Sequence, residues 1–397
     1  MRILMVSDVY YPRINGVSTS IRTFKTTLEE HGLQVDLLAP QYPNETEEAG
    51  VIRIPSRYLP LDPEDRMMRY REIIRRLPAL KQKAYDLIHI HTPFVAHYAG
   101  IRLARSLGIP VIESYHTYFE EYLHHYAPFL PRRMLRYIAR RFSRRQCQAV
   151  DRVIVPSTAM RDVLQGYGIR AAMEIIPTGL SLHEFQPGDR LEFCRQHDID
   201  PDRPILVHIG RVAFEKNIDF LLDCVAEAVQ QIPGLLFIIA GEGPARQHLE
   251  QRARELGLAE NTLFLGYLRR GKPLWNCYSA ANAFIFASHT ETQGLVLLEA
   301  MALGVPVIST AAMGTLDILA PRKGALVAAA EGSDFTRKIV MLLQTPALQR
   351  RLGEEGRLYV RQWTTEVMTR KLTDLYRTLC RLPDQAGKPD TQTATGN

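Results

Sequence analysis

The chain has 397 residues but no long uncharged hydrophobic run. The longest such run, Ala300–Gly314, has 15 residues, whereas a membrane-spanning helix needs about 20. The apolar run within residues 1–7 is too short for a secretion signal and favours a first buried strand. We therefore expect a cytoplasmic protein whose contact with any membrane is peripheral.

Cysteine is also scarce. The five cysteines are dispersed, and no two of them form a Cys-x-x-Cys pair. This pattern favours reduced thiols over a disulfide framework or a zinc site. The sequence also offers no cluster of His and Asp residues with the spacing of a magnesium or manganese site.

Acidic residues are too few to balance the basic ones in one half of the chain. Residues 1–187 contain 25 Lys and Arg against 19 Asp and Glu, whereas residues 188–397 contain 24 of each kind. The whole formal net charge of +6 therefore lies in the N-terminal half. This asymmetry indicates an anionic partner for that half.

The sequence is rich in short apolar runs that alternate with amphipathic helical patterns. This alternation is typical of parallel sheets covered by helices on both faces, and it occurs twice, with a break near residues 185–188. The expected strands are Arg2–Ser7, Gln34–Ala39, Val51–Ile54, Leu87–Ile90, Val111–Ser114, Val153–Pro156, Glu174–Pro177, Ile205–Ile209, Leu235–Ala240, Thr262–Leu265, Ala283–Ala287, Val305–Thr310 and Gly324–Val327.

We predict an α/β protein with two Rossmann-like domains that face each other across a cleft. Ligands bind in such folds beyond the carboxyl ends of the parallel strands. Residues 1–187 would form the first domain and residues 188–363 the second. Residues 364–381 would form a helix that packs back toward the first domain, and residues 382–397 a disordered tail.

A glycine between two carboxylates marks a segment that suits an anionic ligand that also carries hydroxyls. Gly294 opens a helical pattern, so the amides of Gly294, Leu295 and Val296 would bind phosphate at a helix N-terminus. Glu291 precedes this helix, and Glu299 lies about one and a half turns inside it. These carboxylates could hold a transferred sugar and the ribose of a nucleotide. The alternative is a surface glutamate followed by a helix that faces the core.

Further candidate residues follow other predicted strands. Arg211 and Lys216 lie at the carboxyl end of a strand, where two cations could neutralise a diphosphate leaving group. Gly16, Gly241 and Gly243 would let a ligand approach the backbone closely. Ordinary surface charges and turns required only by the fold are the alternatives.

Histidines lie on two strands of the first half. His116 lies just beyond the end of the predicted strand Val111–Ser114 and would face the cleft from the acceptor side. His89 and His91 alternate on another strand, where a structural role is favoured.

Residues 131–145 form an arginine-rich helical pattern. Leu130, Met134, Ile138 and Phe142 recur every four residues and share one face. Such a helix could lie on an anionic bilayer, where each cation contributes about 1 kcal/mol, or it could pack its apolar stripe on the core. Nucleic acid is not favoured because no stacking aromatics alternate with the charges. The candidate membrane-docking residues are Arg132, Arg133, Arg136, Arg140, Arg141, Arg144 and Arg145.

The chain resembles the retaining family-4 glycosyltransferases of the GT-B architecture. The resemblance is carried by the order of Gly16, Arg211, Lys216, Glu291 and Glu299. The resemblance covers nearly the whole chain up to about residue 380. Segments 7–23, 115–126 and 291–300 are similar to the bacterial monoglucosyldiacylglycerol synthases, which glycosylate diacylglycerol at the inner membrane face.

The resemblance implies a role for each donor-site residue. Arg211 and Lys216 would hold the donor diphosphate, and Glu299 would hold the ribose. Glu291 would bind hydroxyls of the transferred sugar, together with the amides near Gly294. The resemblance also implies that the anomeric configuration is kept without a carboxylate nucleophile, and that the enzyme requires neither a metal ion nor a cofactor.

The resemblance also assigns the acceptor side. His116 would contact the sugar and support transfer, and Gly16 would let its loop close over the phosphates. The arginine-rich helix would correspond to the membrane-docking element of the family.

The expected activity is transfer of a hexose, glucose from UDP-glucose, to the hydroxyl of a membrane lipid such as diacylglycerol. A GDP-mannose donor and a soluble or polysaccharide acceptor remain open. A nucleotide-sugar epimerase or a non-catalytic nucleotide-sugar-binding protein would belong to another class. Both are disfavoured because the acceptor-side His116 segment and the donor-side pair of glutamates occur together.

Overall fold

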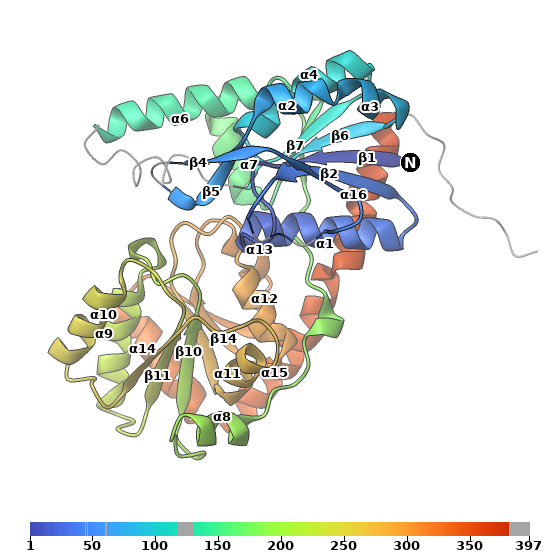
Figure 1. The fold of residues 1–397 in the computed structure, drawn as a ribbon. Coiled ribbons are helices and arrows are strands. Elements are labelled where there is room, and N and C mark those ends of the chain that lie inside the picture. Colours follow the sequence, from blue (N-terminus) through green and yellow to red (C-terminus); the bar gives the residue numbers. More distant parts are fainter. Residues whose placement is uncertain (44, 46, 60–61, 117–130, 381–397) are drawn as a thin grey trace, which may run out of the picture.

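Two α/β domains are stacked one above the other in the structure, a computed structural model (Figure 1). It describes residues 1–380 except residues 44, 46, 60–61 and 117–130. The predicted tail, residues 382–397, lies outside the described part. The two sheets confirm the predicted pair of Rossmann-like domains.

The first domain contains a seven-stranded parallel sheet in the order β3-β2-β1-β6-β7-β8-β9. The order reverses at β1, so the carboxyl ends of β1 and β6 form a topological switch point. The strands are β1 (Arg2–Val6), β2 (Gln34–Pro40), β3 (Val51–Ile54), β6 (Leu87–Ile90), β7 (Val111–Ser114), β8 (Arg152–Val155) and β9 (Met173–Ile175).

The second domain contains a six-stranded parallel sheet in the order β12-β11-β10-β13-β14-β15. Its switch point lies between β10 and β13, and it positions the predicted donor-binding residues. The strands are β10 (Ile205–Ile209), β11 (Leu236–Ala240), β12 (Thr262–Gly266), β13 (Ala283–Phe286), β14 (Val307–Thr310) and β15 (Ala325–Ala328).

An antiparallel hairpin of β4 (Ser56–Leu59) and β5 (Asp62–Met68) was not predicted. Its sequence is largely charged and lacks an alternating apolar pattern. The hairpin is a two-stranded sheet beside the first domain's main sheet.

Helices cover both faces of each sheet. Those of the first domain are α1 (Gly16–Glu30), α2 (Tyr70–Arg75), α3 (Leu77–Gln82), α4 (Val95–Leu107), α6 (Arg132–Cys147) and α7 (Thr158–Gly166). Those that follow are η1 (Leu182–Glu184), α8 (Arg190–Gln196), η2 (Phe214–Lys216), α9 (Ile218–Val229), α10 (Arg246–Glu255), α11 (Lys272–Ala280), α12 (Leu295–Ala302), α13 (Thr315–Leu319), α14 (Gly332–Leu343), α15 (Pro346–Tyr359), η3 (Val360–Trp363) and α16 (Thr365–Cys380). In the described part of the chain, none of them has the length and apolar character needed to cross a bilayer.

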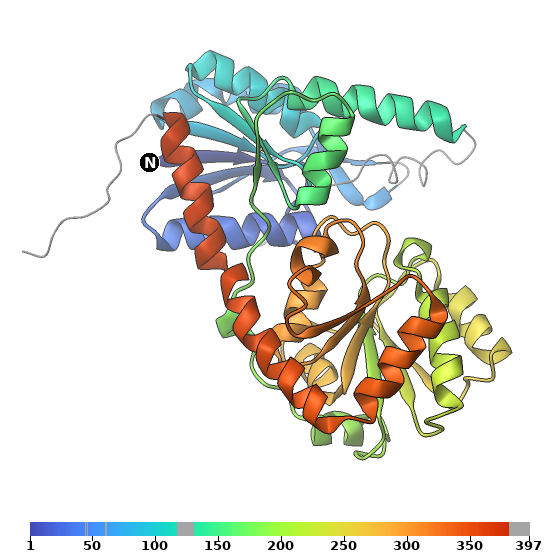
Figure 2. The same ribbon diagram turned by 180° about the vertical axis from the view of Figure 1, so that it is seen from behind.

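The last helix, α16, returns to the first domain and packs against α1 (Figure 2). Leu372 and Tyr376 are fully buried in the core cluster that covers this face of the first sheet. At the crossing point the amide of Leu180 donates to the carbonyl of Trp363 at 2.8 Å, and the amide of Thr365 donates to that of Leu180 at 3.1 Å. The two connections between the domains therefore lie side by side.

Candidate active site

The switch point of the second sheet brings Lys216 and Glu291 together. Lys216 ends η2, which follows β10, whereas Glu291 follows the neighbouring strand β13. The ammonium group of Lys216 donates a hydrogen bond to a carboxylate oxygen of Glu291, and about a fifth of each side chain is exposed. Arg211 lies at the same strand end, but its side chain is 62% exposed and its guanidinium is 3.6 Å from Glu215.

The predicted phosphate-binding amides lie at the N-terminus of α12. Gly294 is the N-cap, with a φ of 97° that favours glycine, and Leu295 is the first helical residue. A β-carbon at Gly294 would also lie 2.9 Å from the methyl group of Thr315. The backbone conformation at position 294 therefore requires glycine. No side chain caps the amides of this first turn.

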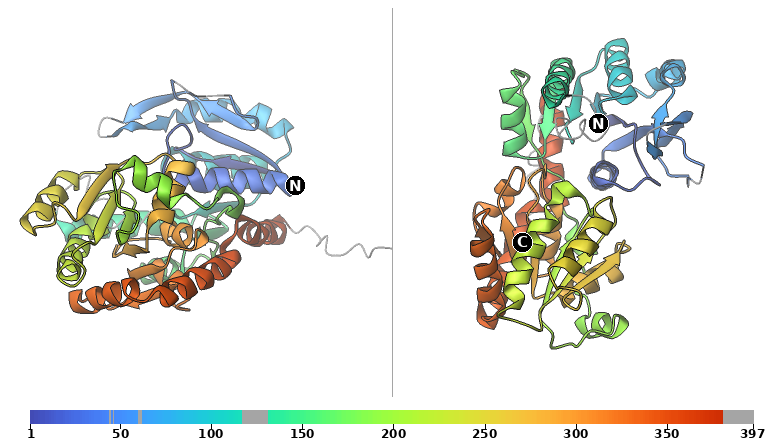
Figure 3. Two further views of the ribbon diagram at one scale, coloured as in Figure 1. Left: turned by 90° about the horizontal axis from the view of Figure 1, so that it is seen from below. Right: turned by 90° about the vertical axis from the view of Figure 1, so that its left-hand side faces the viewer.

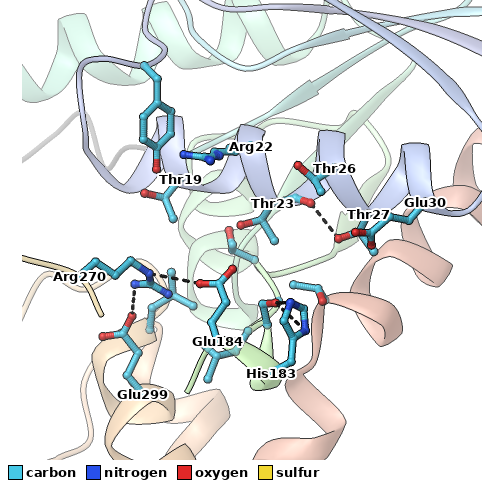
Figure 4. A pocket seen from close by; sticks show the side chains of 17 residues that line it. Thr19, Arg22, Thr23, Thr26, Thr27, Glu30, His183, Glu184, Arg270 and Glu299 are labelled. Carbon is cyan, nitrogen blue, oxygen red and sulfur yellow. Dashed lines mark hydrogen bonds and ion pairs between the residues drawn. The ribbon is translucent and has the colours of Figure 1, made fainter. Parts of the chain in front are cut away.

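Glu299 lies one turn further along α12 and lines a cavity of about 400 Å³ between the domains (Figure 4). Arg270 donates to one carboxylate oxygen at 2.9 Å, and the hydroxyl of Tyr278 donates to the other at 3.1 Å. Burial and the charge of Glu299 raise the pKa of Tyr278 well above its usual value, so the phenol remains a neutral donor. The carboxylate is thus oriented by two fixed donors.

Arg270 is a residue of this cavity that was not predicted. Its guanidinium lies 3.5 Å from Glu184 and over the rings of Phe185 and Trp275, each at 5.4 Å. Its only signal in the sequence is its place shortly after β12, at the carboxyl end of a strand. The ion pair with Glu299 joins residues 29 positions apart and depends on the fold.

The first domain supplies the opposite wall of the cavity through α1 and the loop before it. Figure 4 shows Thr19, Arg22 and Thr23 above Glu184 and Arg270. Hydroxyl, carboxylate and guanidinium groups therefore face each other across the space, an arrangement suited to a polyhydroxylated anionic ligand.

The predicted glycines have different surroundings. A β-carbon at Gly241 would lie 1.8 Å from the carbonyl oxygen of Gly210, and one at Gly243 would lie 2.2 Å from that of Val212. Close packing of two loops therefore accounts for both glycines. Gly16 is the first residue of α1, and a β-carbon there would have no heavy atom within 4 Å. The packing of the fold therefore does not itself require glycine at position 16, and its predicted role beside a ligand stays a prediction.

Three histidines meet at the carboxyl ends of β6 and β7. The Nε2 of His116 lies 3.4 Å from the Nδ1 of His91. Burial lowers the pKa of His116 to about 4 and that of His91 well below its usual value. His89 is held by Tyr376 at 2.7 Å and by Ser114 at 2.8 Å, and burial lowers its pKa to about 3. All three rings are therefore neutral near pH 7.

Helix α6 lies at the outer end of the first domain, away from the second (Figure 3). The face that packs on the core contains Leu135, Ala139 and Ser143. The predicted stripe does not pack as a whole, because Met134 and Ile138 are 41% and 44% exposed. Small side chains allow the observed face to approach the sheet, where Ser143 shares a hydrogen bond of 2.8 Å with Tyr115.

The basic face of α6 borders a hollow of about 700 Å³ that Arg105 of α4 also lines. Among the described residues, Arg105, Arg141 and Arg145 have no ion-pair partner, and the lining contains no carboxylate. Arg144 donates to the carbonyl oxygen of Tyr167 at 2.9 Å. Arg133 is exposed, and Arg136 and Arg140 have contacts of their own. Arg132 begins the helix.

Within the described residues, no three His, Cys, Asp or Glu side chains are grouped closely enough to hold a metal ion. The positive groups at the site are protein side chains and the helix N-terminus of α12.

Two family profiles match the two halves of the chain. Residues 14–184 match the profile described as Glycosyltransferase Family 4, and residues 189–359 match Glycosyl transferases group 1. Among solved structures, sucrose-phosphate synthase from Thermosynechococcus elongatus superposes with a TM-score of 0.77 at 24% identity, covering 96% of this chain and 100% of that one. The Anabaena protein HepE, solved with UDP-glucose, gives a TM-score of 0.72 at 16% identity, covering 96% and 100%.

Sequence relatives point to the same family. The alpha-monoglucosyldiacylglycerol synthase of Streptococcus pneumoniae is 36% identical over 78% of this chain and 71% of its own length. The enzyme of that name from Acholeplasma laidlawii is 25% identical over 95% and 96%. A GDP-mannose-dependent alpha-mannosyltransferase of Mycobacterium tuberculosis is 30% identical over 82% and 83%. The chain therefore belongs to glycosyltransferase family 4, has the GT-B fold and is a glycosyltransferase.

Proposed function

We propose that this glycosyltransferase transfers glucose from UDP-glucose to the hydroxyl of a membrane lipid such as diacylglycerol. The product keeps the anomeric configuration of the donor, and the reaction uses no metal ion. The enzyme works as a peripheral protein at the inner face of the cytoplasmic membrane. The observation that carries the lipid acceptor is the exposed basic and apolar surface of α6, together with the two glycolipid synthases among the relatives.

The donor would lie along the N-terminus of α12. Its ribose hydroxyls would donate to Glu299, which Arg270 and Tyr278 hold in place. The diphosphate would accept hydrogen bonds from the amides near Gly294, and its charge would be balanced by Lys216 and Arg211 after side-chain rotation. Glu291 would then accept hydrogen bonds from the sugar once Lys216 turns to the phosphates.

The transfer itself needs few protein groups. The bond between the anomeric carbon and the diphosphate oxygen breaks, and a bond to the acceptor oxygen forms on the same face. The acceptor proton passes to the departing phosphate oxygen, so no carboxylate nucleophile takes part. Fixed cations and helix amides stabilise the charge that develops on the leaving group. His116, which is neutral near pH 7, would hydrogen-bond the sugar from the first domain.

The surface of α6 has the features of an interfacial helix. Met134, Tyr137 and Ile138 are exposed beside the arginines, and Tyr137 is 65% exposed. Apolar side chains would enter the acyl boundary while guanidinium groups contact anionic headgroups. This arrangement would hold the acceptor-side domain against the bilayer that contains the lipid substrate.

A GDP-mannose donor is the second candidate, because the relative from Mycobacterium tuberculosis is named for that donor. It would use the same contacts to ribose and diphosphate and differ only in the base and the sugar. A donor panel distinguishes the two.

The test offers the purified enzyme a panel of nucleotide sugars with membrane lipid extract and identifies glycolipids by mass spectrometry. We expect a monohexosyl diacylglycerol from UDP-glucose and none from GDP-mannose. A glycolipid formed only with GDP-mannose would overturn the donor. Transfer to soluble sugars but to no lipid would overturn the acceptor, and donor conversion without any acceptor would indicate an epimerase.

A further inference from the structure

Gln293 lies between Glu291 and the helix N-cap Gly294, in residues 291–294, which we call the donor loop. Its side chain nevertheless contacts the segment that connects the first domain to the second. It is 7% exposed. The amide of Thr178 donates to its side-chain oxygen at 2.9 Å, and its side-chain nitrogen donates to the carbonyl of Thr178 at 2.8 Å. One carboxamide thus satisfies both polar groups of a buried backbone position, and only this orientation of the amide does so.

Thr178 belongs to the segment that leads from the first domain into the second. It follows β9 and precedes η1. Its hydroxyl donates to the hydroxyl of Ser20 at 2.8 Å, and Ser20 is 1% exposed on α1. The same helix begins at Gly16 and lines the interdomain cavity. A continuous chain of hydrogen bonds therefore runs from the donor loop to α1.

The donor loop is also fixed on its other side. The amide of Gly314 donates to the carbonyl of Glu291 at 2.8 Å, and a β-carbon at Gly314 would lie 2.1 Å from the carbonyl oxygen of Thr292. Close by, Asp317 of α13 accepts a hydrogen bond of 2.7 Å from the amide of Thr158 at the start of α7. The loop is thus held between its own domain and the first domain.

We propose that Gln293 is a positioning residue that couples the donor loop to the first domain through Thr178 and Ser20. It does not touch the donor itself. It keeps Glu291 and the amides near Gly294 aligned with α1 and with the acceptor side, so that the bound donor faces the acceptor hydroxyl. This inference rests on the proposed function for the nature of the reaction, but the coupling applies to any nucleotide sugar bound at this loop.

The test separates binding from turnover. In Gln293→Glu the side chain keeps its length, but a carboxylate oxygen replaces the donor that faces the carbonyl oxygen of Thr178, so one of the two hydrogen bonds is lost. In Gln293→Met both hydrogen bonds are lost. We expect kcat to fall about tenfold in both variants, because a small misalignment of reacting groups costs that much or more. We expect the Kd for UDP, measured by calorimetry, to change less than threefold.

Matched variants follow the chain of hydrogen bonds. Thr178→Ser keeps the hydroxyl and should match the wild type, whereas Thr178→Val removes it and should lower kcat about threefold. Gln344→Met, at an exposed glutamine, is the control for the substitution itself. Thermal denaturation checks that all variants are folded at the assay temperature.

Two results would overturn the coupling. One is an unchanged kcat in both Gln293 variants. The other is an equal loss in kcat and UDP affinity, which would mean a local disturbance of the donor loop. The kcat ratio is measured with whichever nucleotide sugar the wild type consumes, so a wild type that rejects UDP-glucose contradicts only the proposed donor.

Discussion

Charge reversal on α6 tests membrane docking most directly. Arg141 and Arg145 are exposed, line the basic hollow and have no ion-pair partner among the described residues, so their replacement leaves the fold intact. Arg141→Glu with Arg145→Glu changes the local charge by four units. Each charge contributes about 1 kcal/mol near an anionic surface. The free energy of binding to the bilayer should therefore weaken by about 4 kcal/mol, which lowers the partition coefficient roughly a thousandfold.

The assay is co-sedimentation with vesicles that contain a third of anionic lipid, at low and at high salt. The control is Arg195→Glu with Arg350→Glu, which makes the same change in net charge on exposed positions of the second domain. A third variant, Met134→Ser with Ile138→Ser, should weaken the free energy of binding to vesicles by about 1 kcal/mol for each of these partly exposed side chains. Salt should weaken the first effect by screening and leave the third unchanged.

Equal binding by the wild type and the α6 charge variant would refute this account of α6. So would an equal loss in the control pair, because that result would mean a response to net charge alone. Binding by neutral vesicles with undiminished strength would likewise contradict a role for the arginines.

Further predictions concern the donor site and the fold. Glu299→Gln should raise the KM for the nucleotide sugar roughly tenfold or more in initial-rate assays, because a charged acceptor of hydrogen bonds is lost; an unchanged KM would argue against ribose binding there. Gly241→Ala should lower the free energy of unfolding by about 3 kcal/mol or more in urea titrations, since its β-carbon would overlap the carbonyl oxygen of Gly210. Gly332→Ala, with no heavy atom within 4 Å of the new β-carbon, should be nearly neutral. The wild type should lose about 2 kcal/mol of stability between pH 7 and pH 5 through His89 alone, because the unfolded chain takes up a proton at its ordinary pKa of about 6.5 while the folded pKa is about 3. In His89→Gln this part of the pH dependence should vanish, and an identical slope in both proteins would speak against a neutral buried ring.

The parallel sheets were predictable because their central strands are buried on both faces and appear as apolar runs. All thirteen predicted strands lie within two residues of observed ones. The β4–β5 hairpin was missed since its charged sequence carries no such pattern. That Lys216 and Glu291 lie close together was also predictable, because the carboxyl ends of neighbouring strands meet at one edge of a sheet.

Contacts between distant segments were not predictable. The carboxylate of Glu299 is oriented by Arg270 and Tyr278, which only the packing of α11 and the loop after β12 brings to it. On α6 two stripes repeat every four residues, and periodicity alone does not distinguish them. The stripe with Ala139 and Ser143 is the one that packs, because small side chains permit the closer approach.

The return of α16 means that the first lobe does not correspond to a single continuous stretch of the gene, whereas the second does. A fragment ending at residue 187 would lack Leu372 and Tyr376, which complete the core beneath α1, and it would lose the hydrogen bond between Tyr376 and His89. The outgoing and returning connections are bonded to each other at Leu180 and Thr364, so the two crossings between the lobes form one paired connection. Swapping lobes between relatives to change acceptor or donor preference would therefore require exchange of the last helix along with the first lobe.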